Sequence, residues 1–187
     1  ISIGKDTYIA GEQVTITEAV NGNLNIAAGK VSIASTVAGD VQAAGGEVSI
    51  TGSVSDNVRI LSGNTSISGR VSGTVTVVAG ELHIEKTAVI GGGLLITGGT
   101  VVIDGTVNGM LKAYGSDITV NGTVNGITEI RGDEVAVNGL IGGNATVTGT
   151  SFVIGETARF NGKLDYWSLQ GQRDLSSSVK GTATYRD

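Results

Sequence analysis

Apolar and polar residues alternate in short runs along most of the chain, and these runs recur at a nearly constant spacing. A motif of the form apolar-x-Gly-x-apolar provides anchors that are separated by 17 or 19 residues. Alternation places successive side chains on opposite faces of a strand, and the apolar residues are mainly the β-branched Val and Ile. Each unit is therefore predicted to hold two or three short strands separated by glycine bends. The anchors are Ile3, Val20, Val37, Val54, Val71, Ile90, Val107, Val124, Ile141, Phe160 and Val179.

Further positions keep the same period, with glycine two places after most anchors and aliphatic residues four and six places after. Like positions come together when a chain winds as a parallel coil, because residue i then lies on residue i+17. Asn-Gly pairs, as at Asn108 and Asn121, instead favour hairpins, but a hairpin reverses residue order. The sequence thus predicts an all-β, single-domain parallel β-helix (β-solenoid) of about ten coils of 17–19 residues. An antiparallel sandwich or barrel is the alternative.

The repeat also predicts how the domain is organised. Residues 1–168 form the β-helix, and residues 169–187 form an irregular final coil and C-terminal cap. Two coils carry a two-residue insertion at the same corner, within residues 83–88 and 153–158, which leaves the interior positions intact. The segment 164–169 holds the single tryptophan, Trp167, which is expected either to cap the open core or to contact another rod.

Composition narrows the class of protein. The 187 residues include 31 glycines, no proline and no cysteine, with 40% hydrophobic residues and a net charge of −5. This composition excludes a disordered chain and collagen, and its acidity argues against a nucleic-acid binder. The uncharged run 87–103 contains too many glycines for a membrane-spanning helix. The chain does not begin with a charged region followed by an apolar stretch, as a signal peptide does, so we expect that such a segment is absent or was removed.

Candidate catalytic residues are few. The single histidine, His83, lies between two interior positions, so alternation points it outward and favours a solvated surface residue. Asp117 and Glu134 share an outward column one coil apart, a spacing that retaining glycosidases use. Arg131 and Asp133 lie nearby and would join them in a small charged site.

A solvated ladder of charges is the other interpretation of these residues. Lys112 and Glu129 share a neighbouring column as an expected surface ion pair. Neither a repeated calcium-binding nonapeptide nor a glycine loop opening a helix is present. We therefore expect no enzyme activity, metal, cofactor or nucleotide.

Three segments carry a resemblance to a known family. They are GDVQAAGGEVSI at residues 39–50, NGMLKAYG at 108–115 and ARFNGKL at 158–164. With the rest of residues 1–168 they resemble the bactofilin, or polymer-forming, family. The resemblance implies a right-handed, three-sided β-helix that polymerises end to end without nucleotide, as a scaffold near the bacterial membrane or cell wall.

The chain departs from typical cytoplasmic bactofilins in having more coils and no proline-rich tails. It is more similar to the bactofilin-like domains of exported envelope proteins. The expected location is therefore the bacterial cell envelope, outside the cytoplasm after signal removal, with a membrane-associated cytoplasmic location as the alternative.

Solenoid ends independently favour self-association, because an unblocked sheet edge invites another strand. The chain itself is the expected partner, with membrane or cell-wall components as further partners and no nucleic acid. The alternatives are a β-helix enzyme acting on polysaccharides and a surface adhesin or spacer that does not polymerise. The expected assembly interface comprises Ile1, Ile3, Ile9, Val14 and Ile16 at the N-terminal end, and Phe160, Leu164, Tyr166, Trp167, Leu169, Val179 and Tyr185 at the C-terminal end.

Overall fold

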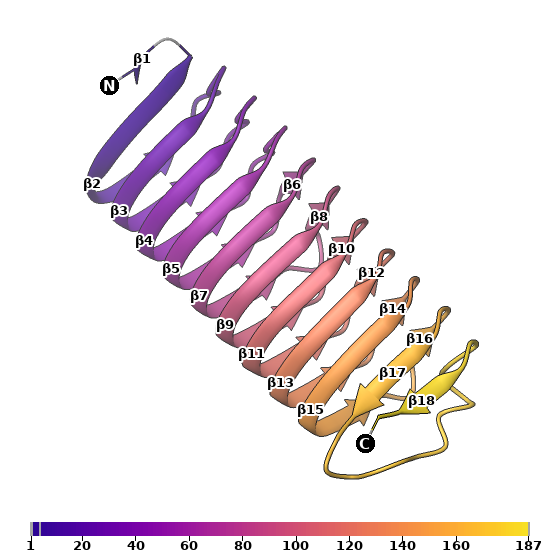
Figure 1. Cartoon of the computed structure of the whole chain (residues 1–187). Coiled ribbons are helices and arrows are strands. Elements are labelled where there is room, and N and C mark those ends of the chain that lie inside the picture. Colours follow the sequence, from indigo (N-terminus) through magenta and orange to yellow (C-terminus); the bar gives the residue numbers. More distant parts are fainter. Residues whose placement is uncertain (1, 4, 187) are drawn as a thin grey trace.

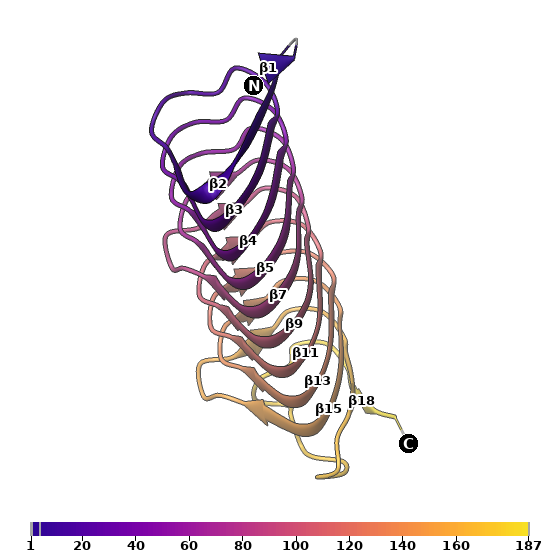
Figure 2. The same ribbon diagram turned by 90° about the vertical axis from the view of Figure 1, so that its left-hand side faces the viewer.

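The computed structural model describes the backbone of residues 2–3 and 5–186 and the side chains of residues 5–186. Within this part the chain forms an all-β parallel solenoid without a helix. It has about eleven coils, one more than predicted. The coils stack along a single axis, and the two ends of the chain lie at opposite ends of the rod (Figures 1 and 2).

One long side of the rod is a sheet of twelve strands, in the order β1-β2-β3-β4-β5-β7-β9-β11-β13-β15-β17-β18. Neighbouring strands are parallel except β1 and β2, which run antiparallel. The pairing offset is 17 residues, or 19 where a corner carries an insertion. The bounds are β1 Ser2–Ile3, β2 Asp6–Ile16, β3 Leu24–Ile33, β4 Val41–Ile50, β5 Val58–Ile67, β7 Val75–Ile84, β9 Leu94–Ile103, β11 Leu111–Val120, β13 Thr128–Val137, β15 Ala145–Ile154, β17 Leu164–Trp167 and β18 Ala183–Tyr185.

A second sheet of six two-residue strands forms the other side, in the order β16-β14-β12-β10-β8-β6. Isolated parallel bridges from Val20 through Val37 and Val54 to Val71 extend this side toward the N-terminus. These strands contain the anchor residues of the sequence repeat. Their bounds are β6 Arg70–Val71, β8 Val89–Ile90, β10 Thr106–Val107, β12 Thr123–Val124, β14 Leu140–Ile141 and β16 Arg159–Phe160.

The long strands differ from the predicted short ones. Each runs unbroken for ten or eleven residues from β2 to β15. In β4 the buried residues are Val41 and Ala43, then Val48 and Ile50, so the alternation changes phase in the middle. The chain bends there and continues as the same strand, as the curved ribbons in Figure 2 show. The central glycines therefore bend a strand and do not end it.

Equivalent aliphatic residues form continuous ladders inside the rod, as the sequence columns predicted. One ladder runs Ile33, Ile50, Ile67, Ile84 and Ile103, and every member is fully buried. Burial of such side chains is worth about 1.5–3 kcal/mol each. Because each coil covers its neighbour, this burial is available only to a stack of coils.

Both predicted insertions lie at the same corner and close in the same way. Thr87 donates from its hydroxyl to the Ser68 carbonyl at 3.0 Å, and Thr157 donates to the Asn138 carbonyl at 2.7 Å. The alanine that follows each threonine is buried. The extra residues are therefore tied to the preceding coil, and the ladders pass through undisturbed.

Close approach of neighbouring coils explains most of the glycine content. A Cβ atom on Gly122 would lie 1.9 Å from the carbonyl oxygen of Gly105, inside the backbone of the neighbouring coil. Among the described residues, Gly171 has the single positive φ, at 71°, with open space around it. Glycine is therefore required at the corners because a larger side chain would not fit there, and not because the backbone has a left-handed conformation.

Replacing an interior aliphatic residue with a charged one tests the ladders. Ile50→Asp leaves a carboxylate without a partner among apolar residues, and we expect it to lower the free energy of unfolding by about 4 kcal/mol or more. Denaturant unfolding at neutral pH measures the change. Gln42→Asp in the same strand is the control, because residue 42 is exposed, and an equal loss in both variants would contradict the assignment of inside and outside.

Alanine substitutions separate the two roles of glycine. Gly122→Ala should cost about 3 kcal/mol, because two coils must move apart to admit the methyl group. Gly171→Ala should cost about 1 kcal/mol, from the left-handed backbone conformation alone. Thermal unfolding of both variants measures the difference, and the reverse order would refute the spacing argument.

Candidate functional site

The N-terminal end of the rod is formed by the first coil. Of the residues predicted there, Ile9 and Val14 are half-buried against the core and Ile16 is buried. Strand β1 pairs with β2 only at Asp6 and Thr7. From Ile9 to Ile16, no strand among the described residues pairs with the outer edge of β2. Ile1 and the side chain of Ile3 lie outside the described residues.

The C-terminal end is organised differently, because the chain folds over its own core there. Phe160, Leu164, Tyr166 and Val179 are buried, so these four predicted interface residues lie inside the rod. Trp167 and Tyr185 are half-buried, and Leu169 is 72% exposed. Most of the apolar side chains predicted for a contact with another molecule are therefore covered by the chain itself.

Tyr166 closes the C-terminal end of the core. Its ring lies 6.0 Å from that of Phe152 and 5.5 Å from that of Tyr185, as centroid distances. Its hydroxyl accepts a hydrogen bond from the Arg173 backbone N–H at 2.7 Å and donates to the Arg173 carbonyl at 3.2 Å. The hydroxyl thereby fixes the loop that follows β17 (Figure 1). Trp167 pairs in register with Thr148 on the outward side, so the capping residue is Tyr166 and not Trp167.

Arg173 is a structural residue of this cap that the sequence did not reveal. Its guanidinium carbon lies 5.4 Å from the centre of the Phe152 ring and 5.9 Å from that of Tyr166, a cation–π arrangement. The Nε and Nη2 atoms are buried without a hydrogen-bond partner. The residue lies outside the regular repeat, so no column predicts its place.

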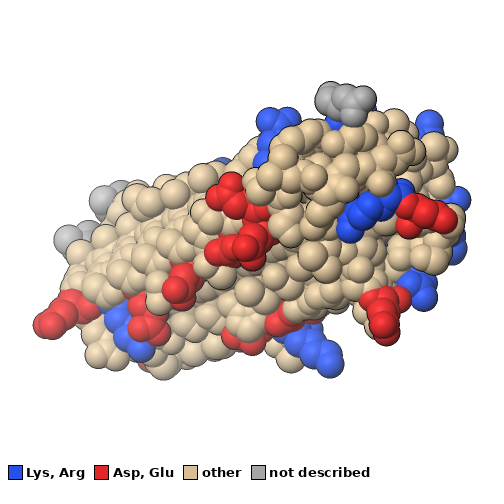
Figure 3. Space-filling view, turned by 90° about the horizontal axis from the view of Figure 1, so that it is seen from below, with Lys and Arg blue, Asp and Glu red and all other residues tan. Residues whose placement is uncertain are grey.

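Charged side chains on the flank pair across neighbouring coils. The predicted pair is present, with Lys112 Nζ 3.7 Å from Glu129 Oε2. Arg131 Nη2 also lies 3.0 Å from Glu129 Oε1, and the Tyr114 hydroxyl donates to that oxygen at 3.1 Å. Figure 3 shows charged side chains on this view of the rod separated by wide uncharged areas. Such exposed pairs contribute little to stability.

Asp117 and Glu134 are register neighbours on β11 and β13, as their shared column predicted, and both are exposed. They border a depression of about 120 Å³, whereas ligand pockets usually have several hundred Å³. Arg131 forms an ion pair with Glu129 and none with Asp133 or Glu134. The four residues therefore do not form the compact charged site that was considered.

His83 points outward, as predicted, and lies between two carboxylates. Its Nε2 atom is 2.7 Å from Asp104 Oδ2 in the next coil, and its Nδ1 atom is 3.3 Å from Glu85 Oε1. The Asn121 side chain donates to the other oxygen of Asp104 at 2.7 Å. Asp104 and Glu85 occupy the corner column, so the histidine links a strand to this corner.

Asparagine and aspartate side chains form a ladder of hydrogen bonds at the corner that precedes the long strands. The Asn23 side-chain oxygen accepts from the Asp40 N–H at 2.8 Å, and Asp40 Oδ1 accepts from the Asn57 N–H at 2.9 Å. The Asn57 oxygen accepts from the Thr74 N–H at 3.0 Å. Each side chain thus satisfies a backbone donor of the next coil.

Two carboxylates at the corners of the coils, those of Asp40 and Asp104, have a lowered pKa. The backbone N–H of Asn57, helped by its side chain and by Arg59, holds the pKa of Asp40 below the ordinary 3.8, and partial burial opposes this. Hydrogen bonds from Asn121 and then His83 lower the pKa of Asp104. The charged form of both residues is therefore favoured in the folded chain.

Comparisons with known proteins add no assignment. No protein-family model matches the chain, and neither curated proteins nor solved structures gave a match. Within the described residues, no helix is long and apolar enough to cross a membrane. The same residues contain no cluster of three or more His, Asp or Glu side chains suited to a metal.

The lowered pKa of Asp40 predicts a pH effect. A carboxyl with a lower pKa in the folded state contributes stability above its unfolded pKa and loses this contribution as the pH falls through its folded pKa. Asp40→Asn keeps an acceptor oxygen and removes the titration, so its stability should fall less than that of the wild type below about pH 4. Urea unfolding at pH 6 and pH 3 measures this. The control is Asp56→Asn, which removes an exposed carboxylate, and an equal acid loss in wild type and Asp40→Asn would contradict the ladder's role.

Proposed function

We propose that this chain is a structural protein that assembles end to end, through its terminal coils, into filaments that need no nucleotide. A scaffold at the bacterial cell envelope is the corresponding role. The open edge of the first coil is the single observation that carries this proposal. The resemblance to polymer-forming proteins supports the same function, and it is the source of the envelope location.

The first coil offers both backbone and apolar groups to a partner. None of the strands in the described part of the chain pairs with the outer side of β2 from Ile9 to Ile16. A strand edge with free N–H and C=O groups is a template for another strand unless charge, proline or a covering segment blocks it. Ile9 and Val14 lie only partly buried along this edge. A second coil stacked there would extend the ladders of the core.

The C-terminal end offers a smaller surface. Strand β18 is the last of the long sheet and pairs on one side only, with β17. Leu169, in the capping loop, is strongly exposed. Contact at this end therefore involves the short β18 edge and the loop, while the aromatic residues beneath stay in place.

An enzyme acting on polysaccharides receives less support from the geometry. Asp117 and Glu134 have the expected register, but they lie on an open face beside a depression of about 120 Å³. A sugar chain held for cleavage needs a larger enclosed surface. Failure to assemble would instead favour the non-polymerising spacer or adhesin.

Ile9→Lys tests the proposed N-terminal contact. The ammonium group would be placed at the stacking surface, where burial without a partner is costly. We expect at least a ten-fold increase in the concentration needed for assembly, measured by sedimentation velocity and electron microscopy. Thr15→Lys on the same strand is the matched control, because residue 15 is exposed.

Two outcomes would count against the proposal. Wild-type chains that remain monomeric at high concentration would refute end-to-end assembly. Unchanged assembly of Ile9→Lys, with a normal thermal unfolding profile, would remove the N-terminal coil from the contact.

A further inference from the structure

An outward row of residues on the first half of the long strands changes character along the rod. The row, here called the flank row, pairs in register from β2 to β9 and comprises Ala10, Ala27, Ala44, Leu61, Val78 and Thr97. Its first three members are small, and the next two are large and apolar. Leu61 is 61% exposed and Val78 is 48% exposed.

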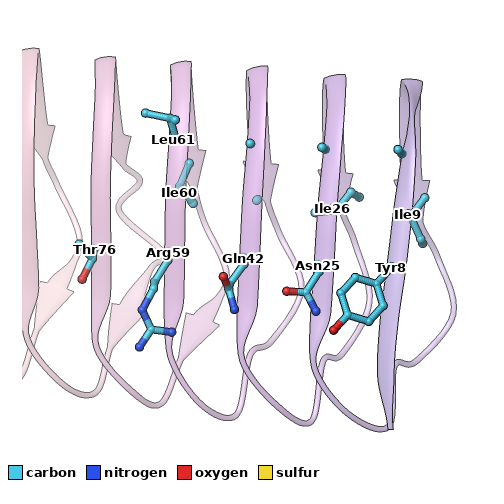
Figure 4. Close-up of a pocket in the computed structure, with 13 residues that line it drawn as sticks. Tyr8, Ile9, Asn25, Ile26, Gln42, Arg59, Ile60, Leu61 and Thr76 are labelled. Carbon is cyan, nitrogen blue, oxygen red and sulfur yellow. The ribbon is translucent and has the colours of Figure 1, made fainter. Parts of the chain in front are cut away.

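The small residues leave the surface hollow. A depression of about 940 Å³ extends over the first coils, and Ala10, Ala27 and Ala44 line it. Tyr8 and Thr76 lie at the two ends of this hollow, and Leu61 lies on the coil before Thr76 (Figure 4). The same row therefore carries a hole over three coils and a ridge over the next two.

The hole and the ridge repeat at the same spacing along one row, so two copies of this row can fit against each other. A two-fold axis parallel to the strands, between Ala44 and Leu61, reverses the row of a facing copy. It places Leu61 opposite Ala44 of the second copy and Val78 opposite Ala27. Because both rows repeat at the coil spacing of about 4.8 Å, all these pairs meet together. In such an isologous contact each pair occurs twice.

We propose that this flank pairs with the same flank of a second copy of the chain, with the two rods antiparallel. The contact goes beyond end-to-end assembly, because it needs neither end of the rod. It joins rods side by side. An exposed apolar row next to a matching hollow is the type of surface that marks such contacts.

The adjacent outward row also fits this arrangement. It runs Tyr8, Asn25, Gln42, Arg59, Thr76 and Leu95 in the same register. The same axis places Arg59 opposite Gln42, whose amide oxygen accepts from a guanidinium. It also sets Asn25 opposite Thr76. Arg59 Nη1 lies 3.7 Å from Asp40 Oδ2 in its own chain, which offsets the repulsion between the two arginines near the axis.

The size of the contact sets its strength. Six coils give a strip about 29 Å long. A strip of this length buries less area than a standard interface, which buries about 1,600 Å². Single rods should therefore associate weakly. Rods joined end to end would present many such strips, and the linked contacts would strengthen one another.

Cysteine cross-linking detects even a weak contact, and the natural chain has no cysteine. Ala27→Cys and Val78→Cys should cross-link under oxidising conditions when the two variants are mixed. Neither should cross-link alone, because two copies of residue 27 would lie about 14 Å apart, three coil spacings, too far for a disulfide. Ile127→Cys mixed with Ala27→Cys gives the background of random collisions, since Ile127 is exposed elsewhere.

Exchanging the ridge and the hole tests the symmetry. Leu61→Ala removes the ridge, and Ala44→Leu fills the hole, so each should lower the cross-linking yield between positions 27 and 78 about five-fold or more. The double variant Leu61→Ala/Ala44→Leu restores one ridge and one hole in each copy and should recover the yield. Both side chains lie on the outer surface, and thermal unfolding of each variant checks that the rod is intact.

All variants are compared in the Val14→Lys background, which changes the open edge of β2 outside the hollow, so that loss of end-to-end assembly is separated from loss of lateral pairing. A mixture that cross-links no more than the Ile127→Cys background would overturn the proposal. Cross-linking of Ala27→Cys alone would show parallel rods and overturn the antiparallel arrangement. A double variant that remains as low as the single variants would exclude the proposed match between ridge and hole.

Discussion

Contact between equivalent residues of successive coils is the constraint on which the whole molecule depends. Interior positions must repeat, because the ladder of Ile33, Ile50 and Ile67 is buried only by its own neighbours. Corner positions must stay small, because the backbone of one coil occupies the space of a side chain on the next. Polar corners must offer acceptors, and the Asn23, Asp40 and Asn57 side chains provide them to the backbone above. One spacing thus governs the core, the glycines and the amide ladder.

This constraint explains why the sequence predicts so much of the fold. A ladder requires the same residue type every 17 or 19 positions, so the parallel winding, the interior columns and the tolerated corner insertions are visible in the sequence. Lys112 and Glu129 were predictable for the same reason, since a shared column implies adjacency. The Asn-Gly pairs suggested hairpins, but stacking between coils outweighs the local turn preference. The long bent strands were not predicted, because a change of phase within a strand resembles a break between two strands.

Prediction failed where the repeat ends. The repeat places Tyr166 inside, six places after its anchor Phe160, whereas Trp167 is large but falls at an outward position. Arg173 lies in a loop with no equivalent in other coils, so no column locates it over the aromatic rings. The unequal ends follow from this: a regular strand edge at one end, and an irregular cap over aromatic residues at the other.

Residues in the outward rows do not have to stack inside the core. Their variation along the rod is therefore a better indication of function than the interior positions are. Side chains on the flank cover one another only in part, and a uniform row would satisfy the fold as well as a varied one. The change from alanine to leucine and valine between Ala44 and Val78 therefore has no explanation in the stability of the rod. Large apolar side chains in water are unfavourable unless something covers them. A surface that pairs a hollow with a ridge at the same spacing supplies its own cover, which is why a second copy of this flank is the partner that the arrangement fits best.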